Sequence, residues 1–412
     1  MLIFNHFDDR LKENCISGRS IVLKNPYKPG AGFAPEYLAG RDQLLDTATN
    51  NLNELKEGGM VMHTVFYGVR GVGKTVLLNR VEEMADNLGF LYSHIECNEN
   101  FDFNKNIIIQ SKKFINQLSL IKSVKELIDK VKLVVTSFKT TYSPDDNTWS
   151  FGWSQQPYNV ETADTGDFTT DLITLFTSLG KLAQKANVPI CFFIDEIQAL
   201  DKKYLVALIT AIHRMNQLGL PILLYAAGLP TILRIAGDAK SYSERLFNFT
   251  KISSLNDNDA IDAITVPALQ YGVKFDDAAV SLILKHTGGY PYFIQQYGRI
   301  IWNLAAIDRH VTKEIVHTSY DEYTETLDNS FYGVRFNRST KAEKDFLLAM
   351  SQCKHFPCAM NEVSKKMNRD SHSISPLRNN LINKGLIYSP SFGEIDFTVP
   401  HFDRFLERTF LK

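Results

Sequence analysis

Residues Gly68 to Thr75 have the residue types and the spacing of a loop that binds phosphate groups. They read G-V-R-G-V-G-K-T and fit the pattern G-x-x-x-x-G-K-[ST]. Glycines let backbone N–H groups turn inward around phosphates, the lysine reaches the β and γ phosphates, and the threonine hydroxyl suits Mg²⁺. The run therefore predicts a site for ATP and Mg²⁺. The residues expected to contact the nucleotide are Gly68, Val69, Arg70, Gly71, Val72, Gly73, Lys74, Thr75 and Val76.

Two acidic residues, Asp195 and Glu196, end the apolar segment V-P-I-C-F-F-I-D-E, far from the loop in the sequence. In a doubly wound sheet the carboxyl ends of the strands meet at the ligand-binding edge, so this segment brings both carboxylates beside the loop. We expect Asp195 and Thr75 to hold Mg²⁺, and Glu196 to orient the water that attacks the γ phosphate. Together with Lys74, they predict ATP hydrolysis.

The elements that must position these residues alternate along the chain. Four apolar, partly β-branched segments are typical of buried strands: 60–69, 89–97, 188–196 and 220–228. Helical spacing separates them, most clearly from Asp42 to about Lys56, after the loop, and from Phe168 to Ala186. The predicted fold class is α/β, with a P-loop and a parallel sheet covered by helices on both faces.

The length of 412 residues exceeds what one hydrophobic core usually organises, so several domains are expected. Helical patterns at 341–350, at 359–367 and from near Pro376 precede the alternating stretch G-E-I-D-F-T-V-P, which is winged-helix order. The predicted domains are an N-terminal arm (1–35), a P-loop ATPase core (36–254) with an insertion at about 98–167, an all-helical lid (255–335) and a winged-helix domain (336–412).

The insertion has two parts with different compositions. Its first part is helical and basic, and its second part is polar and contains Trp149 and Trp153. These tryptophans could dock a partner or pack along the edge of a hairpin, and packing is the simpler interpretation.

Composition limits the classes of function that remain. A net charge of -1 argues against a surface coated in positive charge for general nucleic-acid binding. No apolar run is long enough to span a membrane, and residues 1–10 lack the features of a secretory signal, so a soluble cytoplasmic protein is expected. Five scattered cysteines imply no disulfide framework, and a metal site at Cys353, His355 and Cys358 lacks a second ligand pair.

The motifs together resemble the AAA+-related P-loop ATPases of the origin-recognition and STAND type. The resemblance rests on F-A-P-E-Y-L-A-G-R-D, G-V-R-G-V-G-K-T, C-F-F-I-D-E-I-Q and Y-A-A-G-L-P, and on H-T-G-G-Y-P-Y-F, whose Gly-Tyr-Pro looks like the lid motif of STAND proteins. It covers roughly residues 33 to 400 and implies a helical lid that closes over the nucleotide.

The resemblance also implies roles for three further residues. Arg41 would lie near the adenine, and Pro291 would lean on the nucleotide from the lid. Arg245 is similar to the arginine that such ATPases place by the γ phosphate, often from a neighbouring subunit, which implies a homo-oligomer. A surface arginine paired with Glu244 is the other interpretation, and Arg234 is a weaker candidate for the same role.

Two departures from the family pattern concern turnover. Residues Tyr225 to Gly228 read Y-A-A-G where many AAA+ enzymes carry a polar sensor residue. The lid reads Gly-Tyr-Pro where origin-type ATPases place a sensor arginine. Both changes favour a slow nucleotide switch over a fast processive motor.

The C-terminal residues 336–412 are mildly basic, with twelve Lys or Arg against eight Asp or Glu. The expected recognition helix presents side chains that can reach bases or phosphates, and a second set could hold the DNA backbone. The first set is Arg378, Asn379, Asn380, Asn383 and Lys384, and the second is Lys365, Lys366 and Arg369. A unit that contacts only protein has the same pattern, so DNA and a protein partner both stay open.

The leading hypothesis is an ATP-hydrolysing regulatory switch whose nucleotide state controls self-assembly or the binding of a partner protein or DNA. One alternative is an ATP-dependent DNA-binding loader or regulator. Another is an adaptor that binds nucleotide without hydrolysing it.

Overall fold

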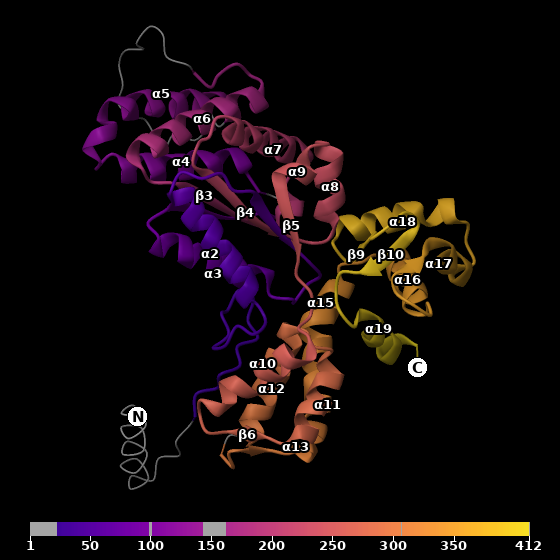
Figure 1. The fold of residues 1–412 in the computed structure, drawn as a ribbon. Coiled ribbons are helices and arrows are strands. Elements are labelled where there is room, and N and C mark those ends of the chain that lie inside the picture. The colour runs from indigo at the N-terminus through magenta and orange to yellow at the C-terminus, as the bar shows by residue number, and fades with distance from the viewer. Residues whose placement is uncertain (1–22, 99–100, 143–161, 306, 412) are drawn as a thin grey trace, which may run out of the picture. The chain divides into compact units, whose positions relative to one another are not determined.

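The computed structural model describes residues 23–98, 101–142, 162–305 and 307–411, and Figure 1 labels its elements. The chain divides into two units. The helical unit contains the described residues up to Ala39 together with Leu255–Thr326, and the sheet unit contains Gly40–Ser254 and Leu327–Lys412. The phosphate loop, the two acidic residues and the C-terminal region therefore belong to the same unit.

The sheet unit is built on five parallel strands in the order β2-β3-β4-β1-β5 (Figure 1). The strands are β1 (His63–Tyr67), β2 (Leu91–Glu96), β3 (Ile190–Asp195), β4 (Ile222–Gly228) and β5 (Phe247–Lys251). The first four lie within the expected segments. Strand β5 was not predicted, because F-N-F-T-K is short and only its first residue is buried.

Helices cover both faces of this sheet, as the class predicts (Figure 1). On one face lie α2 (Asp42–Lys56) and α3 (Lys74–Asn87), and on the other lie α4 (Phe103–Leu118), α5 (Lys125–Tyr142), α6 (Phe168–Ala186) and α7 (Lys202–Gln217). Because β3 is buried on both sides, every one of its residues is apolar except the terminal Asp195. The strand thus ends in a buried carboxylate at the carboxyl edge of the sheet.

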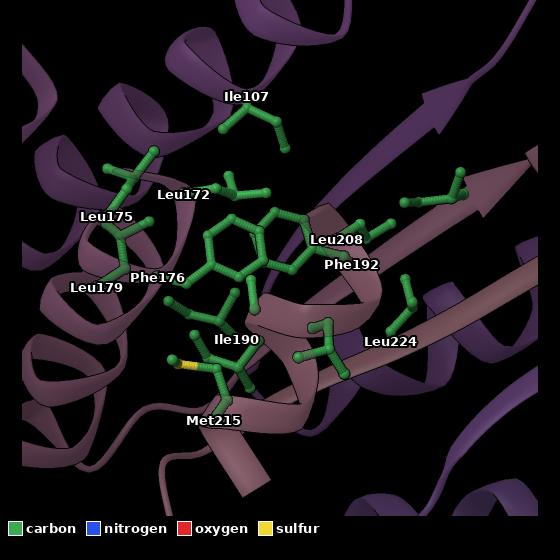
Figure 2. Packing of buried hydrophobic residues seen from close by; sticks show 14 of the residues in the cluster. Ile107, Leu172, Leu175, Phe176, Leu179, Ile190, Phe192, Leu208, Met215 and Leu224 are labelled. Carbon is green, nitrogen blue, oxygen red and sulfur yellow. The ribbon is translucent and has the colours of Figure 1, made fainter. Parts of the chain in front are cut away.

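The core beneath α6 and α7 is aromatic at its centre. Figure 2 shows Phe176 of α6 and Phe192 of β3 surrounded by aliphatic side chains from α6, α7 and the strands. The two rings are stacked, with centroids 5.1 Å apart and planes 6° apart. Complete burial of such a side chain contributes roughly 1.5–3 kcal/mol, so this cluster fixes β3 and its carboxyl end.

The insertion contributes to this core. Its helices α4 and α5, joined by a short 3-10 turn at Lys122–Val124, bury Ile107, Phe114 and Phe138 in the same cluster. The expected hairpin with Trp149 and Trp153 lies outside the described residues.

After β4, the chain forms α8 (Thr231–Ala239) and α9 (Ser243–Leu246), which lead into β5. None of the helices that the structure describes is long and apolar enough to cross a membrane.

The helical unit contains α10 (Asp257–Leu269), α11 (Asp277–Thr287), α12 (Pro291–Ala305), α13 (Lys313–Thr318) and most of α14 (Tyr320–Leu327). The expectation of helices alone is corrected by a pair of two-residue parallel strands, β6 (Lys274–Phe275) and β7 (His310–Val311). Tyr27 of the N-terminal arm is buried in this unit, where its hydroxyl donates to the carbonyl of Ile264. Its ring occupies the space that a side chain at Gly298 would need.

The C-terminal region has winged-helix-like order. It contains a π-helical turn (Asp328–Tyr332), α15 (Gly333–Phe336), α16 (Lys341–Ser351), β8 (Cys358–Ala359), α17 (Met360–Met367), α18 (Ser371–Asn383), β9 (Ile387–Tyr388), β10 (Glu394–Phe397) and α19 (Phe402–Phe410), with a small sheet in the order β8-β10-β9. The expected start of the third helix near Pro376 is wrong. The helix begins at Ser371, because the Asp370 carboxylate caps it by accepting the His372 N–H at 2.9 Å, and Pro376 lies inside it.

Candidate active site

The phosphate loop connects β1 to α3, as its sequence predicts. Gly71 and Gly73 have φ values of 79° and 90°, in the left-handed region that favours glycine. A Cβ at Gly68 would lie 2.1 Å from the carbonyl oxygen of Ile252, so no larger residue fits there. Gly73 is the N-cap of α3, and the loop therefore ends at a helix N-terminus with free N–H groups and a positive dipole end.

Lys74 is the first residue of α3 and is buried. Its ammonium group donates a hydrogen bond of 2.9 Å to the carbonyl of Val69, on the opposite limb of the loop. Burial lowers the pKa of Lys74 to about 8, and the nearby carboxylate of Glu196 acts against this shift. The lysine therefore remains mainly protonated at pH 7, as phosphate binding requires.

Thr75 and Asp195 meet at the carboxyl edge of the sheet. The Thr75 hydroxyl donates to Oδ2 of Asp195 at 2.6 Å, and Asp195 is buried at the end of β3. A hydroxyl and a carboxylate oxygen are ligands that Mg²⁺ accepts, so this pair fits the predicted metal role. Val76 follows in the first turn of α3, half-buried.

Glu196 has a backbone conformation that is unusual for its residue type. Its φ of 51° and ψ of 38° lie in the left-handed region, and its N–H bonds to the Asp195 side chain at 2.8 Å. Its carboxylate accepts a hydrogen bond from the side-chain amide of Gln198 and lies 3.8 Å from the guanidinium of Arg70. Two protein groups, from Gln198 and Arg70, therefore contact the carboxylate that is expected to orient water.

Gln198 is a contact that the sequence analysis missed. Besides holding Glu196, its side-chain oxygen accepts the backbone N–H of Leu229 at 2.9 Å, immediately after β4. A Cβ at Gly228 would lie 2.7 Å from the same oxygen. The glutamine thus links the end of β3 to the end of β4. Its position two residues after Glu196 was the only feature of the sequence that could have predicted this role.

Arg70 joins the loop to the C-terminal region within the sheet unit. Its backbone N–H donates to the carbonyl of Thr398 at 2.8 Å, and Thr398 is completely buried. A Cβ at Gly385, whose φ is +63°, would lie 3.1 Å from the Arg70 guanidinium and 3.1 Å from the Leu229 side chain. Nothing in the sequence pattern indicated this contact.

Arg41 lies beside the loop. It is the buried N-cap residue of α2, and its guanidinium donates to the carbonyl of Ser253 at 2.8 Å and to that of Val72 at 3.3 Å. Arg41 therefore supports the loop from the side of β5. Its expected place near the adenine stays a prediction.

Arg245 and Pro291 lie in different units. Arg245 is exposed on α9, and no ion pair among the described residues joins it to Glu244. Pro291 is the first residue of α12 in the helical unit, where the preceding Gly289, with φ of +71°, accepts the N–H of Leu255 at 2.9 Å. The roles of both residues toward nucleotide remain predictions.

The expected recognition helix presents only part of its predicted set. Lys384 is its C-cap residue, and its ammonium pairs with the buried Glu343 at 2.6 Å. Asn379, Asn380 and Asn383 are exposed. Arg378 lines a cavity of about 510 Å³ together with Arg234 of α8 and the fully exposed Phe392 between β9 and β10.

The sequence pattern argued against a metal site at Cys353, His355 and Cys358. Cys353 and Cys358 are both buried and unpaired by disulfide. Within the described part of the chain, no group of three His, Cys, Asp or Glu side chains could hold a metal ion.

Comparison with known proteins agrees with this geometry. Residues 37–225 match the family model described as an AAA ATPase domain, and residues 329–406 match one described as a domain of unknown function, DUF8462. No curated protein matches the chain.

Three solved structures are similar to this chain, one of them with a TM-score above 0.5. The Walker-type ATPase paby2304 of Pyrococcus abyssi has a TM-score of 0.53 at 12% identity, with 91% of this chain and 97% of that chain covered. The Aeropyrum pernix Orc1 protein in complex with DNA has a TM-score of 0.44 at 14% identity, covering 91% and 94%. Cdc6p from Pyrobaculum aerophilum has a TM-score of 0.46 at 14% identity, covering 92% and 96%. The fold is that of a P-loop ATPase of the AAA+ type, with similarity to an AAA ATPase domain at residues 37–225 and a winged-helix-like C-terminal region.

Proposed function

We propose that this protein is an ATP-binding and ATP-hydrolysing regulatory switch, whose nucleotide state controls self-assembly or the binding of a partner protein or DNA. The observation that carries the proposal is the double contact of Arg70. Its backbone N–H bonds to Thr398 in the C-terminal region, and its guanidinium lies 3.8 Å from Glu196. A change in the phosphate loop would therefore reach both the hydrolytic carboxylate and the C-terminal region.

Nucleotide binding would exchange internal partners for phosphate oxygens. Lys74 would leave the Val69 carbonyl for the β and γ phosphates, because a charge-assisted bond to phosphate is stronger than a bond to a neutral carbonyl. Thr75 and Asp195 would hold Mg²⁺, which neutralises charge on the phosphates when it is bound. The same exchange would stabilise the loop around the nucleotide.

Hydrolysis additionally requires Glu196 to reach a water molecule. In the structure, Gln198 and Arg70 both engage its carboxylate, so these contacts must loosen before Glu196 can orient the nucleophile. This requirement supports a slow rate of turnover. It also supports a switch over a processive motor.

The exposed position of Arg245 supports a role between subunits. A guanidinium beside the γ phosphate would offset the charge that develops on the transferred phosphoryl group. Arg245→Ala should lower turnover and leave ATP binding nearly unchanged. Activity in a mixture of Arg245→Ala and Lys74→Ala proteins would place the arginine in a neighbour's site, and an inactive mixture at every ratio would contradict that placement.

A second candidate function is an ATP-dependent DNA-binding regulator. The cavity between Arg234, Arg378 and the exposed Phe392 favours it, because DNA binding needs cations for phosphates and gains from an aromatic surface for bases. Affinity for duplex DNA should then fall steeply with salt, and Arg378→Ala should reduce both affinity and salt slope. Salt-insensitive or absent binding would leave a protein partner as the ligand of this region.

The switch proposal is tested by particle size and phosphate release measured in parallel. Light scattering on wild type and Glu196→Gln would be recorded with ATP, with ADP and without nucleotide. We expect ATP to drive assembly that the mutant keeps and that wild type loses as phosphate is released. A particle size independent of nucleotide, with no phosphate release, would favour the non-hydrolysing adaptor instead.

A further inference from the structure

A cationic cavity lies beside the phosphate loop and shares only Arg70 with the predicted ATP contacts. Its volume is about 490 Å³. It is lined by Arg70 from the loop, by Arg335 and Arg338 after the π-helical turn, and by Lys384 at the end of α18. Neither Lys74, Thr75 nor Asp195 contributes to its lining. Three segments that are distant in the sequence therefore bring four positive charges to one hollow.

The cations of this cavity are only partly neutralised by the protein. Lys384 pairs with Glu343 at 2.6 Å, and Arg70 lies 3.8 Å from Glu196. No acidic side chain lines the cavity. The hollow therefore carries an excess of positive charge at its surface.

Two guanidinium groups at the cavity have donors without a hydrogen-bond partner among the described residues. Nε of Arg70 is a buried atom that has no hydrogen-bond partner in the described part of the chain. Arg338 is exposed, and no ion pair or side-chain hydrogen bond among the described residues engages its guanidinium. A buried donor without a partner costs about 1–3 kcal/mol, so an anion that accepts from it would be bound favourably.

We propose that this cavity binds a phosphoryl group, with Arg70 and Arg338 as its main contacts. Guanidinium groups present several N–H donors in a fixed fork that matches phosphate oxygens, and Lys384 adds a point charge. The volume admits a phosphoryl group with the ester or anhydride attached to it. The group could come from a free polyphosphate or from the backbone of DNA, and the chemistry of recognition is shared.

An anion in the cavity would also affect Glu196, and this consequence rests on the proposed function. An anion bound by the Arg70 guanidinium competes with the Glu196 carboxylate for the same positive charge. Glu196 would then lose one of its two protein partners and would be held by Gln198 alone. The cavity would thereby couple anion binding to the rate of hydrolysis.

Binding is tested on the full chain with the phosphate loop saturated by a non-hydrolysable ATP analogue and Mg²⁺. Calorimetric titration would use inorganic pyrophosphate in one arm and a duplex oligonucleotide in the other, with wild type, Arg338→Ala and Arg378→Ala. Arg338 is exposed, so its replacement removes a charge without opening the core. Arg378→Ala is the matched control in the pyrophosphate arm alone, because Arg378 lines the other cavity and is itself a candidate DNA contact.

If the ligand of the cavity is a free polyphosphate, we expect pyrophosphate affinity to fall about tenfold or more in Arg338→Ala. The same affinity should be unchanged in Arg378→Ala. If the phosphoryl group belongs to DNA, pyrophosphate should bind poorly. In that case Arg338→Ala should weaken duplex binding and reduce the salt slope of duplex binding by about one. If Arg338→Ala changes neither affinity, the cavity is not a phosphoryl site. If binding depends on Arg338 but turnover with ATP ignores the bound anion, the site stands and its link to Glu196 is overturned.

Discussion

The active site and the C-terminal region differ in where their polar groups find partners. In the active site, the protein supplies them, except at Nε of Arg70: Lys74 bonds to Val69, Thr75 bonds to Asp195, and Glu196 is held by Gln198 and Arg70. In the C-terminal region, Nε of Arg378 is buried without a hydrogen-bond partner among the described residues.

This difference distinguishes a site in a resting arrangement from a surface prepared for an external anion. On the proposed function, nucleotide displaces these internal contacts when it binds. An anion that binds at Arg338 or Arg378 would displace fewer internal contacts.

The largest effect is expected from Glu196→Gln. The amide keeps the shape of the side chain but cannot accept a proton, so turnover should fall by roughly 10²–10⁴ while ATP binding persists. Phosphate release and ATP affinity measured on the same samples separate the two effects. Glu83→Gln is the control, because that side chain is exposed on α3 and its one ion pair within the described ranges is with Arg80. Undiminished turnover in Glu196→Gln would remove its role as the group that orients water.

Lys74→Ala should lower ATP affinity by on the order of a hundredfold or more, because it removes the buried charge that meets the phosphates. Binding of a fluorescent ATP analogue measures this loss. Two exposed cations serve as controls, Lys202→Ala on α7 and Arg338→Ala, and both should leave ATP affinity unchanged. An equal loss in Arg338→Ala would mean that the cavity and the ATP site are one site, and the contrast between them would fail.

Acid should weaken the sheet that carries the active site. His63 of β1 is completely buried, and its imidazole accepts the N–H of Leu224 at 3.1 Å and lies 3.0 Å from the Asn216 side chain. Burial lowers its pKa to about 4. Because the unfolded chain binds the proton more tightly, the stabilisation is complete above about pH 6.5 and is lost as pH falls toward 4.

For His63 alone, the free energy of unfolding should drop by about 2 kcal/mol between pH 7 and pH 5. Urea unfolding at both pH values would compare wild type with His63→Gln, which should lose part of this pH dependence. His401 of the C-terminal region also has a pKa lowered to about 4 by burial, so His401→Gln provides the matched comparison. Identical pH dependence in wild type and His63→Gln would show that the imidazole is not the acid-sensitive group.

The smallest predicted effect separates backbone strain from the contact between the loop and the C-terminal region. Gly385 and Gly393 have φ values of 63° and 78°, so alanine is strained at both. A Cβ at Gly385 would press on Arg70 and Leu229, whereas a Cβ at Gly393 would meet nothing within 4 Å. Gly385→Ala should therefore be less stable than Gly393→Ala by on the order of 1 kcal/mol. Equal losses in thermal unfolding would show that this packing contributes nothing.

The sequence indicated much of the active site because its parts are contiguous or end a buried strand. Glycines with positive φ, Lys74 and Thr75 lie in one eight-residue run, and the all-apolar β3 positions Asp195 at the sheet edge. Helix boundaries such as those of α2 and α6 followed from spacing.

Other features depend on contacts between distant residues, and no local pattern encodes them. The bond from Arg70 to Thr398 joins positions far apart in the chain, and Gln198 acts through the backbone of Leu229. Strand β5 was missed because pairing with β1, and not its own composition, makes it a strand. The early start of α18 depends on Asp370, whereas Pro376 resembled a first helical residue.

The central claim is that the phosphate loop and the C-terminal region respond together to nucleotide through Arg70. Hydrogen exchange measured on Glu196→Gln, with and without ATP and Mg²⁺, tests it most directly. We expect slower exchange in residues 68–75 and, at the same time, faster exchange in residues 385–398, as the contact between Arg70, Gly385 and Thr398 loosens. Protection confined to the loop, with residues 385–398 unchanged, would contradict the account.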